Sequence, residues 1–143
     1  MATDSKDVLL SAGSLPWVPL AEGIDFKLLR SSKETGTWVV LFRCQEGSRF
    51  DRHRHLGAGE YYVIKGRMSY RAGVAVTGDY GYEPLDSIHD CTIFEEYTEL
   101  LFTNYGPVVY INDKDEVTAI LDHSVLSALT AEYLSKNSAA STA

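Results

Sequence analysis

The chain has 143 residues and a mass near 15.9 kDa, which suits one domain with a single core. Its net charge of −7 and pI near 5.0 argue against a nucleic-acid-binding surface, because phosphates require clustered Lys and Arg. No apolar run approaches the roughly 20 residues of a membrane helix, and residues 1–7 are polar with no signal peptide behind them. The two cysteines, Cys44 and Cys91, are too few for a disulfide framework and indicate a reducing compartment. We therefore expect a cytoplasmic protein without nucleic-acid or membrane partners.

Short apolar runs separated by Gly, Asn, Asp and Pro follow one another through most of the chain. They recur every 8–12 residues or so, which is typical of an all-β sandwich or barrel. The predicted strands cover residues 24–29, 37–44, 61–65, 67–71, 74–76, 79–82, 91–94, 99–103, 108–112 and 117–121. The sequence thus predicts one all-β domain.

The two ends of the chain carry different patterns. Residues 1–14 are expected to be a flexible leader, and the sequence LPWVP at 15–19 an extended segment that covers a sheet edge, its own or a neighbour's. An apolar stripe with helical spacing predicts a helix over 124–136, capped by Ser124 or Asp122. The domain is therefore expected to span 15–136, and residues 137–143 to form a disordered tail.

Three of the four histidines stand where a metal ligand can stand. His53 and His55 are separated by one residue, so on a strand both imidazoles point to the same face and can share a cation. A solvated basic loop is the alternative interpretation of this pair. His89 precedes the strand at 91–94 and is either a third ligand or a hydrogen-bonded core histidine. His123 stands alone, and no role is assigned to it.

The residues around these histidines form two spaced motifs. From Gly47 the chain reads G-SRFDR-H-R-H-LGAG-E-YYVIK-G, and from Gly78 it reads G-DYGYE-P-L-D-SI-H. These stretches resemble the cupin motifs G-x5-HxH-x4-E-x6-G and G-x5-P-x-G-x2-H-x3-N. The resemblance implies a small β-barrel of jelly-roll type, followed here by a short C-terminal helix. It also implies a metal held by two histidines and a glutamate of the first motif and one histidine of the second.

The chain departs from these motifs at three positions. Five residues instead of six separate Glu60 from Gly66, Asp86 replaces a glycine, and Ile93 replaces an asparagine. Because side chains alternate between faces along a strand, a slip of one residue can turn Glu60 away from the metal. A site of three histidines without a carboxylate is therefore open beside a site in which Glu60 is a fourth ligand.

A longer resemblance runs from Ile24 to beyond Leu121. The segments IDFKLLRSSKETGTWVVLFRCQEGSRFDRHRH, GEYYVIKGRMSYRAG and YGYEPLDSIHDCTIF resemble the acetylacetone-cleaving, or diketone, dioxygenases. That family implies iron(II) on three histidines, here His53, His55 and His89, in a site that zinc, manganese or nickel can also occupy. Four further residues are implied around the ligands, namely Tyr61, Arg71, Glu83 and Thr92. The same resemblance implies that three residues line the substrate pocket, namely Phe50, Leu100 and Asn104. Relatives carry phenylalanine at the positions of Leu100 and Asn104.

The implied activity is cleavage of a carbon–carbon bond in a β-diketone or a related enolisable ketone by O2. Neutral imidazoles leave a divalent cation its full charge, which favours an anionic bidentate enolate. Two alternatives remain open, a zinc or manganese isomerase or hydrolase and a non-catalytic cupin that binds a small molecule. We further expect a homodimer or homotetramer.

Overall fold

The computed structural model describes residues 6–142. Its elements, in chain order, are η2 (Ala12–Ser14), β1 (Val18–Ala21), β2 (Ile24–Ser31), β3 (Trp38–Cys44), β4 (Arg49–Phe50), β5 (His53–His55), β6 (Gly59–Lys65), β7 (Arg67–Tyr70), β8 (Gly73–Val76), β9 (Tyr80–Glu83), β10 (Ile88–His89), β11 (Thr92–Phe94), β12 (Thr98–Asn104), β13 (Val108–Ile111), β14 (Val117–Leu121) and α1 (His123–Thr142). Strands thus follow one another from the first to the last before a single α-helix, as the sequence predicts.

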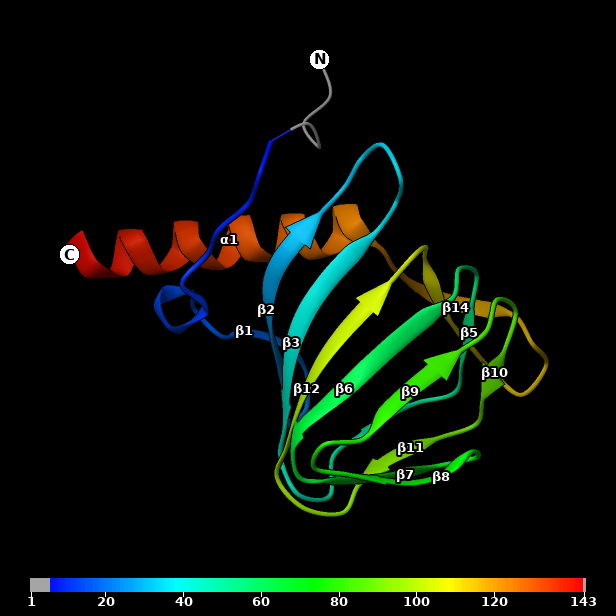
Figure 1. Ribbon diagram of the computed structural model, residues 1–143. Coiled ribbons are helices and arrows are strands. Elements are labelled where there is room, and N and C mark those ends of the chain that lie inside the picture. The colour runs from blue at the N-terminus through cyan, green and yellow to red at the C-terminus, as the bar shows by residue number, and fades with distance from the viewer. Residues whose placement is uncertain (1–5, 143) are drawn as a thin grey trace.

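The strands form three antiparallel sheets. One has six strands in the order β1-β2-β3-β12-β6-β9, and the others have four each, in the orders β10-β5-β13-β14 and β4-β11-β7-β8. Figure 1 shows the six-stranded sheet as one curved wall, with the two smaller sheets facing it and α1 lying beside β1 and β2. This all-β architecture of jelly-roll type confirms the predicted fold class.

Alternation of side chains along the central strands builds the core between the sheets. Along β3 every second residue is buried, from Trp38 to Cys44, and β12 repeats the pattern from Thr98 to Asn104. The pairing of the two strands sets Asn104 opposite Trp38 and Leu100 opposite Phe42. Each large apolar side chain buried in this way contributes about 1.5–3 kcal/mol to folding. The same alternation carries Asn104, a polar residue, into the interior.

The sequence pattern did not reveal four of the strands. Three of them, β4, β5 and β10, have only two or three residues each, too few for a period of two to show. The fourth is β1, which pairs with β2 of its own chain through Val18 and Phe26. The proline-containing segment at 15–19 therefore leads into an edge strand of its own sheet.

Helix α1 packs against the edge of the six-stranded sheet. Asp122 caps its N-terminus, where the carboxylate accepts hydrogen bonds from the Val125 amide (2.9 Å) and the Ser124 hydroxyl (2.8 Å), and Leu126 is fully buried. The helix continues to Thr142, so residues 137–142, expected to be disordered, are helical. At the start of this stretch Nδ2 of Asn137 donates a hydrogen bond of 2.7 Å to the carbonyl of Tyr133, one turn earlier in the helix. The predictions for residues 1–5 and 143 fall outside the described residues. Among residues 6–142, no helix combines the length and apolar character that a membrane crossing demands.

Candidate metal centre

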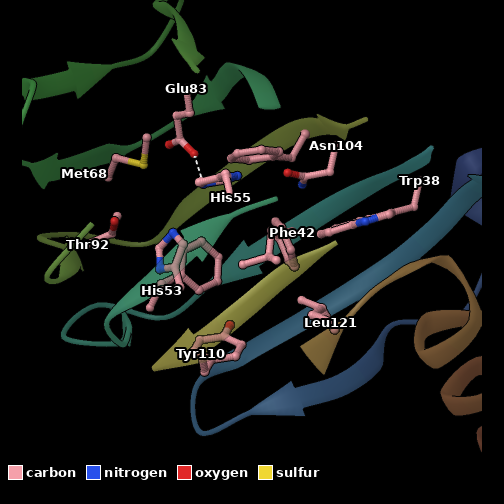
Figure 2. A pocket seen from close by; sticks show the side chains of 13 residues that line it. Trp38, Phe42, His53, His55, Met68, Glu83, Thr92, Asn104, Tyr110 and Leu121 are labelled. Carbon is pink, nitrogen blue, oxygen red and sulfur yellow. Dashed lines mark ion pairs between the residues drawn. The ribbon is translucent and has the colours of Figure 1, made fainter. Parts of the chain in front are cut away.

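Four buried side chains with metal-ligating atoms meet between the sheets. They are His53 and His55 of β5, Glu83 at the end of β9 and His89 at the end of β10. Their ligand atoms all lie within 4.8 Å of one another. The antiparallel pairing of β5 with β10 places His89 opposite His53, which explains how two distant stretches of chain meet at one point. The structure thus brings together the three predicted histidine ligands and adds Glu83 to them. Figure 2 shows His53, His55 and Glu83 of this group.

The three imidazole rings surround a common point. Their centroids are 5.1 Å apart for His53 and His55, and 5.2 Å apart for each of the other two pairs. The peptide carbonyl of Asp51 accepts a hydrogen bond of 2.7 Å from Nδ1 of His53. This bond fixes the tautomer of His53 and leaves its Nε2 without a proton, which is the form that binds a cation.

Several polar atoms of this group lack hydrogen-bond partners among the described residues. They are Nδ1 and Nε2 of His55, Nδ1 of His89 and Oε2 of Glu83, all fully buried. A buried polar atom without a partner destabilises a fold, and native structures rarely leave one. A cation would satisfy Oε2 of Glu83 together with one nitrogen of each ring, since each residue offers one ligand atom to the group. The residues therefore fit a divalent metal, and the donor set is one that iron, zinc and manganese accept.

The protonation states of the group also suit metal binding. Burial lowers the pKa of His53, and burial lowers the pKa of His89 to about 4, so both rings are neutral at pH 7. Burial by itself raises the pKa of Glu83, but contact with His55 and the neighbouring rings outweighs it and keeps that pKa below its usual value. His53 and His89 thus present neutral imidazoles and Glu83 an ionised carboxylate, the forms that coordinate metals.

Glu60, the alternative ligand in the first motif, lies outside this group. Its carboxylate faces the outer side of β6, where the hydroxyls of Tyr80 (2.5 Å) and Tyr105 donate hydrogen bonds to it. These bonds lower the pKa of Glu60. The neighbours of Glu60 on β6, Gly59 and Tyr61, are both buried, so the strand turns Glu60 outward by alternation. The carboxylate of the metal group is therefore that of Glu83 on β9, the strand that precedes His89 in the chain.

The other residues expected around the ligands lie at different depths. Thr92 is buried and lines the cavity beside the histidines. The hydroxyls of Tyr61 and Tyr70 share a hydrogen bond of 2.7 Å, and the Tyr70 ring lies 5.5 Å from that of His89. Arg71 is exposed in the turn after β7, and its charge contributes to lowering the pKa of His89. The Tyr70 ring thus packs beside His89, and Tyr61 holds the Tyr70 hydroxyl in place.

An apolar cavity opens onto three of the four ligating residues, His53, His55 and Glu83 (Figure 2). Its lining residues are Trp38, Phe42, Phe50, His53, His55, Met68, Glu83, Thr92, Phe102, Asn104, Val108, Tyr110 and Leu121. Two of the expected pocket residues, Phe50 and Asn104, belong to this wall. Leu100 does not, because it lies further along β12, fully buried against Phe42 and Val63 of the paired strands.

The sequence did not predict most of the apolar residues that line the cavity. Trp38 and Phe42 carry an alternation signal, which indicates that they point inward without showing that they point to the histidines. Tyr110 lies opposite His53 in the register of β13 and β5, a pairing that no sequence pattern reveals. Phe50, Tyr110 and Leu121 also line a neighbouring surface groove, so they separate the cavity from solvent on that side.

The two other departures from the cupin motifs have local explanations. Asp86 has a φ of 67°, the left-handed conformation that a glycine adopts without strain and that Asp tolerates better than most residues. Its backbone N–H donates a hydrogen bond of 2.7 Å to the carbonyl of His55, which ties the turn to the ligand strand. Ile93 is 45% exposed between the buried Thr92 and Phe94, so its side chain points away from the cavity.

Jelly-roll sheets around a buried group of three histidines and a glutamate define a metal-binding cupin. Within that class the chain belongs to the ChrR cupin-like domain family, whose model matches residues 5–109. The chain is 37% identical over 114 residues to the acetylacetone-cleaving enzyme of Acinetobacter johnsonii. This alignment covers 72% of the chain and 74% of that enzyme.

The solved structures agree with this assignment. The crystal structure of an acetylacetone dioxygenase from Acinetobacter johnsonii has a TM-score of 0.81 at 31% identity, covering 92% of this chain and 95% of that one. An RmlC-like cupin from Ralstonia eutropha JMP134 has a TM-score of 0.85 at 21% identity over 92% of this chain and 88% of its own, which supports the fold. The chain is thus an enzyme of the oxygenase class, a metal-dependent cupin dioxygenase.

Proposed function

We propose that this protein is an iron(II)-dependent dioxygenase that cleaves a carbon–carbon bond of a β-diketone such as acetylacetone. The observation that carries the proposal is the buried group of three histidines and Glu83 at the end of an apolar cavity. The likeness to an acetylacetone-cleaving enzyme over most of the chain supports the substrate class.

In this proposal His53, His55 and His89 hold the iron, and the negative charge of Glu83 offsets part of the charge of the cation. Oε2 of Glu83 lies 2.5 Å from Nε2 of His55, which supports this role of the carboxylate. Bound iron(II) would supply Lewis acidity toward the two oxygens of an enolate and the electron exchange that reaction with O2 requires. The apolar wall formed by Phe50 and its neighbours would exclude bulk water from the reacting carbon.

A β-diketone gives up a proton from its central carbon when it becomes an enolate. Glu83 is the only acidic residue that lines the cavity among the described residues, and we assign Oε2 as the atom that receives this proton. Addition of O2 to the enolate and cleavage of the adjacent carbon–carbon bond give a carboxylic acid and an α-dicarbonyl. One O2 is consumed, and both of its atoms appear in the products.

The test is an oxygen-electrode assay with acetylacetone on protein loaded with iron(II), preceded by elemental analysis of protein purified without chelators. We expect one O2 consumed for each diketone lost, and loss of activity in His89→Ala. His123→Ala is the matched control, because His123 lies outside the metal group at the start of α1. Absence of O2 uptake across a panel of diketones and hydroxyketones would refute the proposal.

The metal group beside an apolar cavity would also suit a second candidate, a cupin that binds a metal and a small molecule without turnover. Zinc fits the same donor set but carries out no redox chemistry. Zinc in the isolated protein, with ligand-induced thermal stabilisation and no O2 uptake after iron loading, would favour this candidate. A zinc or manganese isomerase or hydrolase would instead convert the ligand without O2.

We also propose that the protein forms a homodimer or homotetramer. Supporting observations are the free edge of the six-stranded sheet at β9 and the exposed aromatic side chains on that part of the surface, Tyr62, Tyr80 and Tyr82. Sedimentation equilibrium of the full chain measures the assembly directly, and a monomer at micromolar concentration would contradict the proposal.

A further inference from the structure

A polar side chain stands in the otherwise apolar part of the cavity wall. Asn104, the last residue of β12, is 2% exposed and lines the cavity together with Trp38 and Phe102. Its Oδ1 is fully buried and has no hydrogen-bond partner among the described residues. Trp38 does not supply one, because its indole Nε1 donates to the carbonyl of Gly106 at 3.0 Å.

Asn104 lies close to the metal group. A Cβ built on Gly59, the residue paired with Asn104 on β6, would lie 2.8 Å from Oδ1 of Asn104 and 3.4 Å from Cε1 of His55. The amide and the imidazole therefore border the same small space. Figure 2 shows the amide of Asn104 turned toward His55 and the cavity.

A buried amide without a partner destabilises the free protein, since it has lost water and gained no bond. A ligand that supplies the missing bond gains affinity, whereas an apolar ligand leaves the amide unsatisfied. Rotation of the amide by half a turn exchanges its oxygen and nitrogen, so either atom can face the ligand. A hydroxyl group both donates and accepts, and therefore satisfies the amide in either orientation.

We propose that Asn104 determines specificity and selects an enolisable 1,3-dicarbonyl compound whose carbon arm carries a hydroxyl group near the chelating oxygens. This inference rests on the proposed function and narrows its substrate class. The two dicarbonyl oxygens face the metal group, and the hydroxyl of the arm bonds to the Asn104 amide beside His55.

The test compares two ligands of equal size, 1-hydroxypentane-2,4-dione and hexane-2,4-dione, which differ by a hydroxyl in place of a methyl group. Calorimetry on zinc-loaded protein measures their dissociation constants without turnover. The wild type is expected to bind the hydroxylated ligand about tenfold more tightly, the size of effect that one buried hydrogen bond produces. Asn104→Leu is expected to abolish or reverse the preference.

Thr103→Val is the matched control, because Thr103 neighbours Asn104 on β12 but points to the opposite face. It should keep the wild-type preference. If Asn104→Leu does not fold, Asn104→Ala tests the same prediction. A thermal midpoint of Asn104→Leu at or above that of the wild type is also expected, because the variant removes a buried amide oxygen that has no hydrogen-bond partner among the described residues.

The proposal on Asn104 is overturned if the wild type shows no preference, if it binds neither ligand, or if the Asn104 variants keep the preference. Oxygen uptake by the iron-loaded protein then tests the proposed function separately. If the protein binds the hydroxylated compound more tightly but consumes no O2 with either compound, the proposed dioxygenase activity is refuted and the role of Asn104 is retained. Equal cleavage of both compounds by the wild type and Asn104→Leu removes the role of Asn104 and leaves the dioxygenase.

Discussion

The carboxylate oxygen Oε2 of Glu83 lies 2.5 Å from Nε2 of His55 and 3.8 Å from Nε2 of His89, with all three residues buried. The shorter contact lacks the alignment of a hydrogen bond, since both of its atoms remain without a hydrogen-bond partner among the described residues. Two such atoms that lie close together without forming a hydrogen bond have the arrangement of ligands around a shared metal position. Glu83 therefore belongs to the metal group by geometry, although it comes from a different strand than the histidines.

Replacement of this carboxylate by an amide is expected to weaken the metal site. Glu83→Gln keeps the size of the side chain but removes the negative charge that offsets part of the charge of the cation. We expect metal affinity to fall about 10- to 100-fold, as when a supporting partner of a ligand is lost. Competition with a chromophoric chelator measures the change. Glu60→Gln, on the outer face, is the control, and an equal loss in both variants would contradict the assignment.

The site also depends on a glycine that leaves room for its neighbours. A Cβ at Gly59 would lie 2.8 Å from Oδ1 of Asn104 and 2.9 Å from Cε1 of Phe102, both on buried side chains. Gly59→Ala is therefore expected to lower the free energy of unfolding by about 1–3 kcal/mol, the usual cost of overpacking. Urea denaturation followed by circular dichroism gives the value. Gly13→Ala, where nothing lies within 4 Å, should leave it within about 0.5 kcal/mol.

The turn before His89 provides a test of backbone conformation. Asp86 has a φ of 67°, in which a side chain with a Cβ costs about 1–2 kcal/mol and Asp or Asn less. We expect Asp86→Ala to reduce the free energy of unfolding by about 1 kcal/mol, and Asp86→Gly and Asp86→Asn to leave it near the wild-type value. Thermal unfolding of the three variants makes the comparison. Equal destabilisation by all three would assign the effect to the carboxylate instead, through its 3.4 Å contact with Arg54.

Cys44 makes stability depend on alkaline pH. Burial, with a smaller contribution from the charge of Asp25, raises the pKa of this thiol. Because the pKa is raised in the folded state, the contribution of the thiol to stability is complete below the unfolded-state value of about 8.5 and declines as the pH rises above it. The free energy of unfolding should thus fall between pH 8 and pH 10 more steeply in the wild type than in Cys44→Ala. An equal slope in both would contradict the prediction.

The same burial predicts different reactivity of the two free cysteines. Cys44 is fully buried, whereas Cys91 is partly exposed. In folded protein, iodoacetamide should therefore modify Cys91 and leave Cys44 unmodified until urea is added. Peptide mass spectrometry distinguishes the two sites, and early modification of Cys44 would show that the core opens.

The sequence by itself determined the fold class and the residue types of the site. Alternating apolar runs with turn residues predict strands because a sheet with one buried face requires that period. The two spaced motifs indicate the histidines because His53 and His55 share one short stretch of chain and His89 lies in another, and each stretch by itself determines its residue types. The outward position of Glu60 also follows from local sequence, because the chain has one residue fewer than the motif between Glu60 and Gly66 and side chains alternate along a strand.

Only the tertiary structure decided which carboxylate joins the histidines and what surrounds them. Glu83 reaches the group because β9 pairs with β6 while β10 pairs with β5, and no local pattern encodes pairings between distant strands. The same holds for the unpartnered amide of Asn104, whose position in the cavity depends on its register with Trp38 and Gly59. Local periodicity determines which face a side chain occupies, whereas the neighbours on that face depend on long-range register, which the packed structure alone fixes.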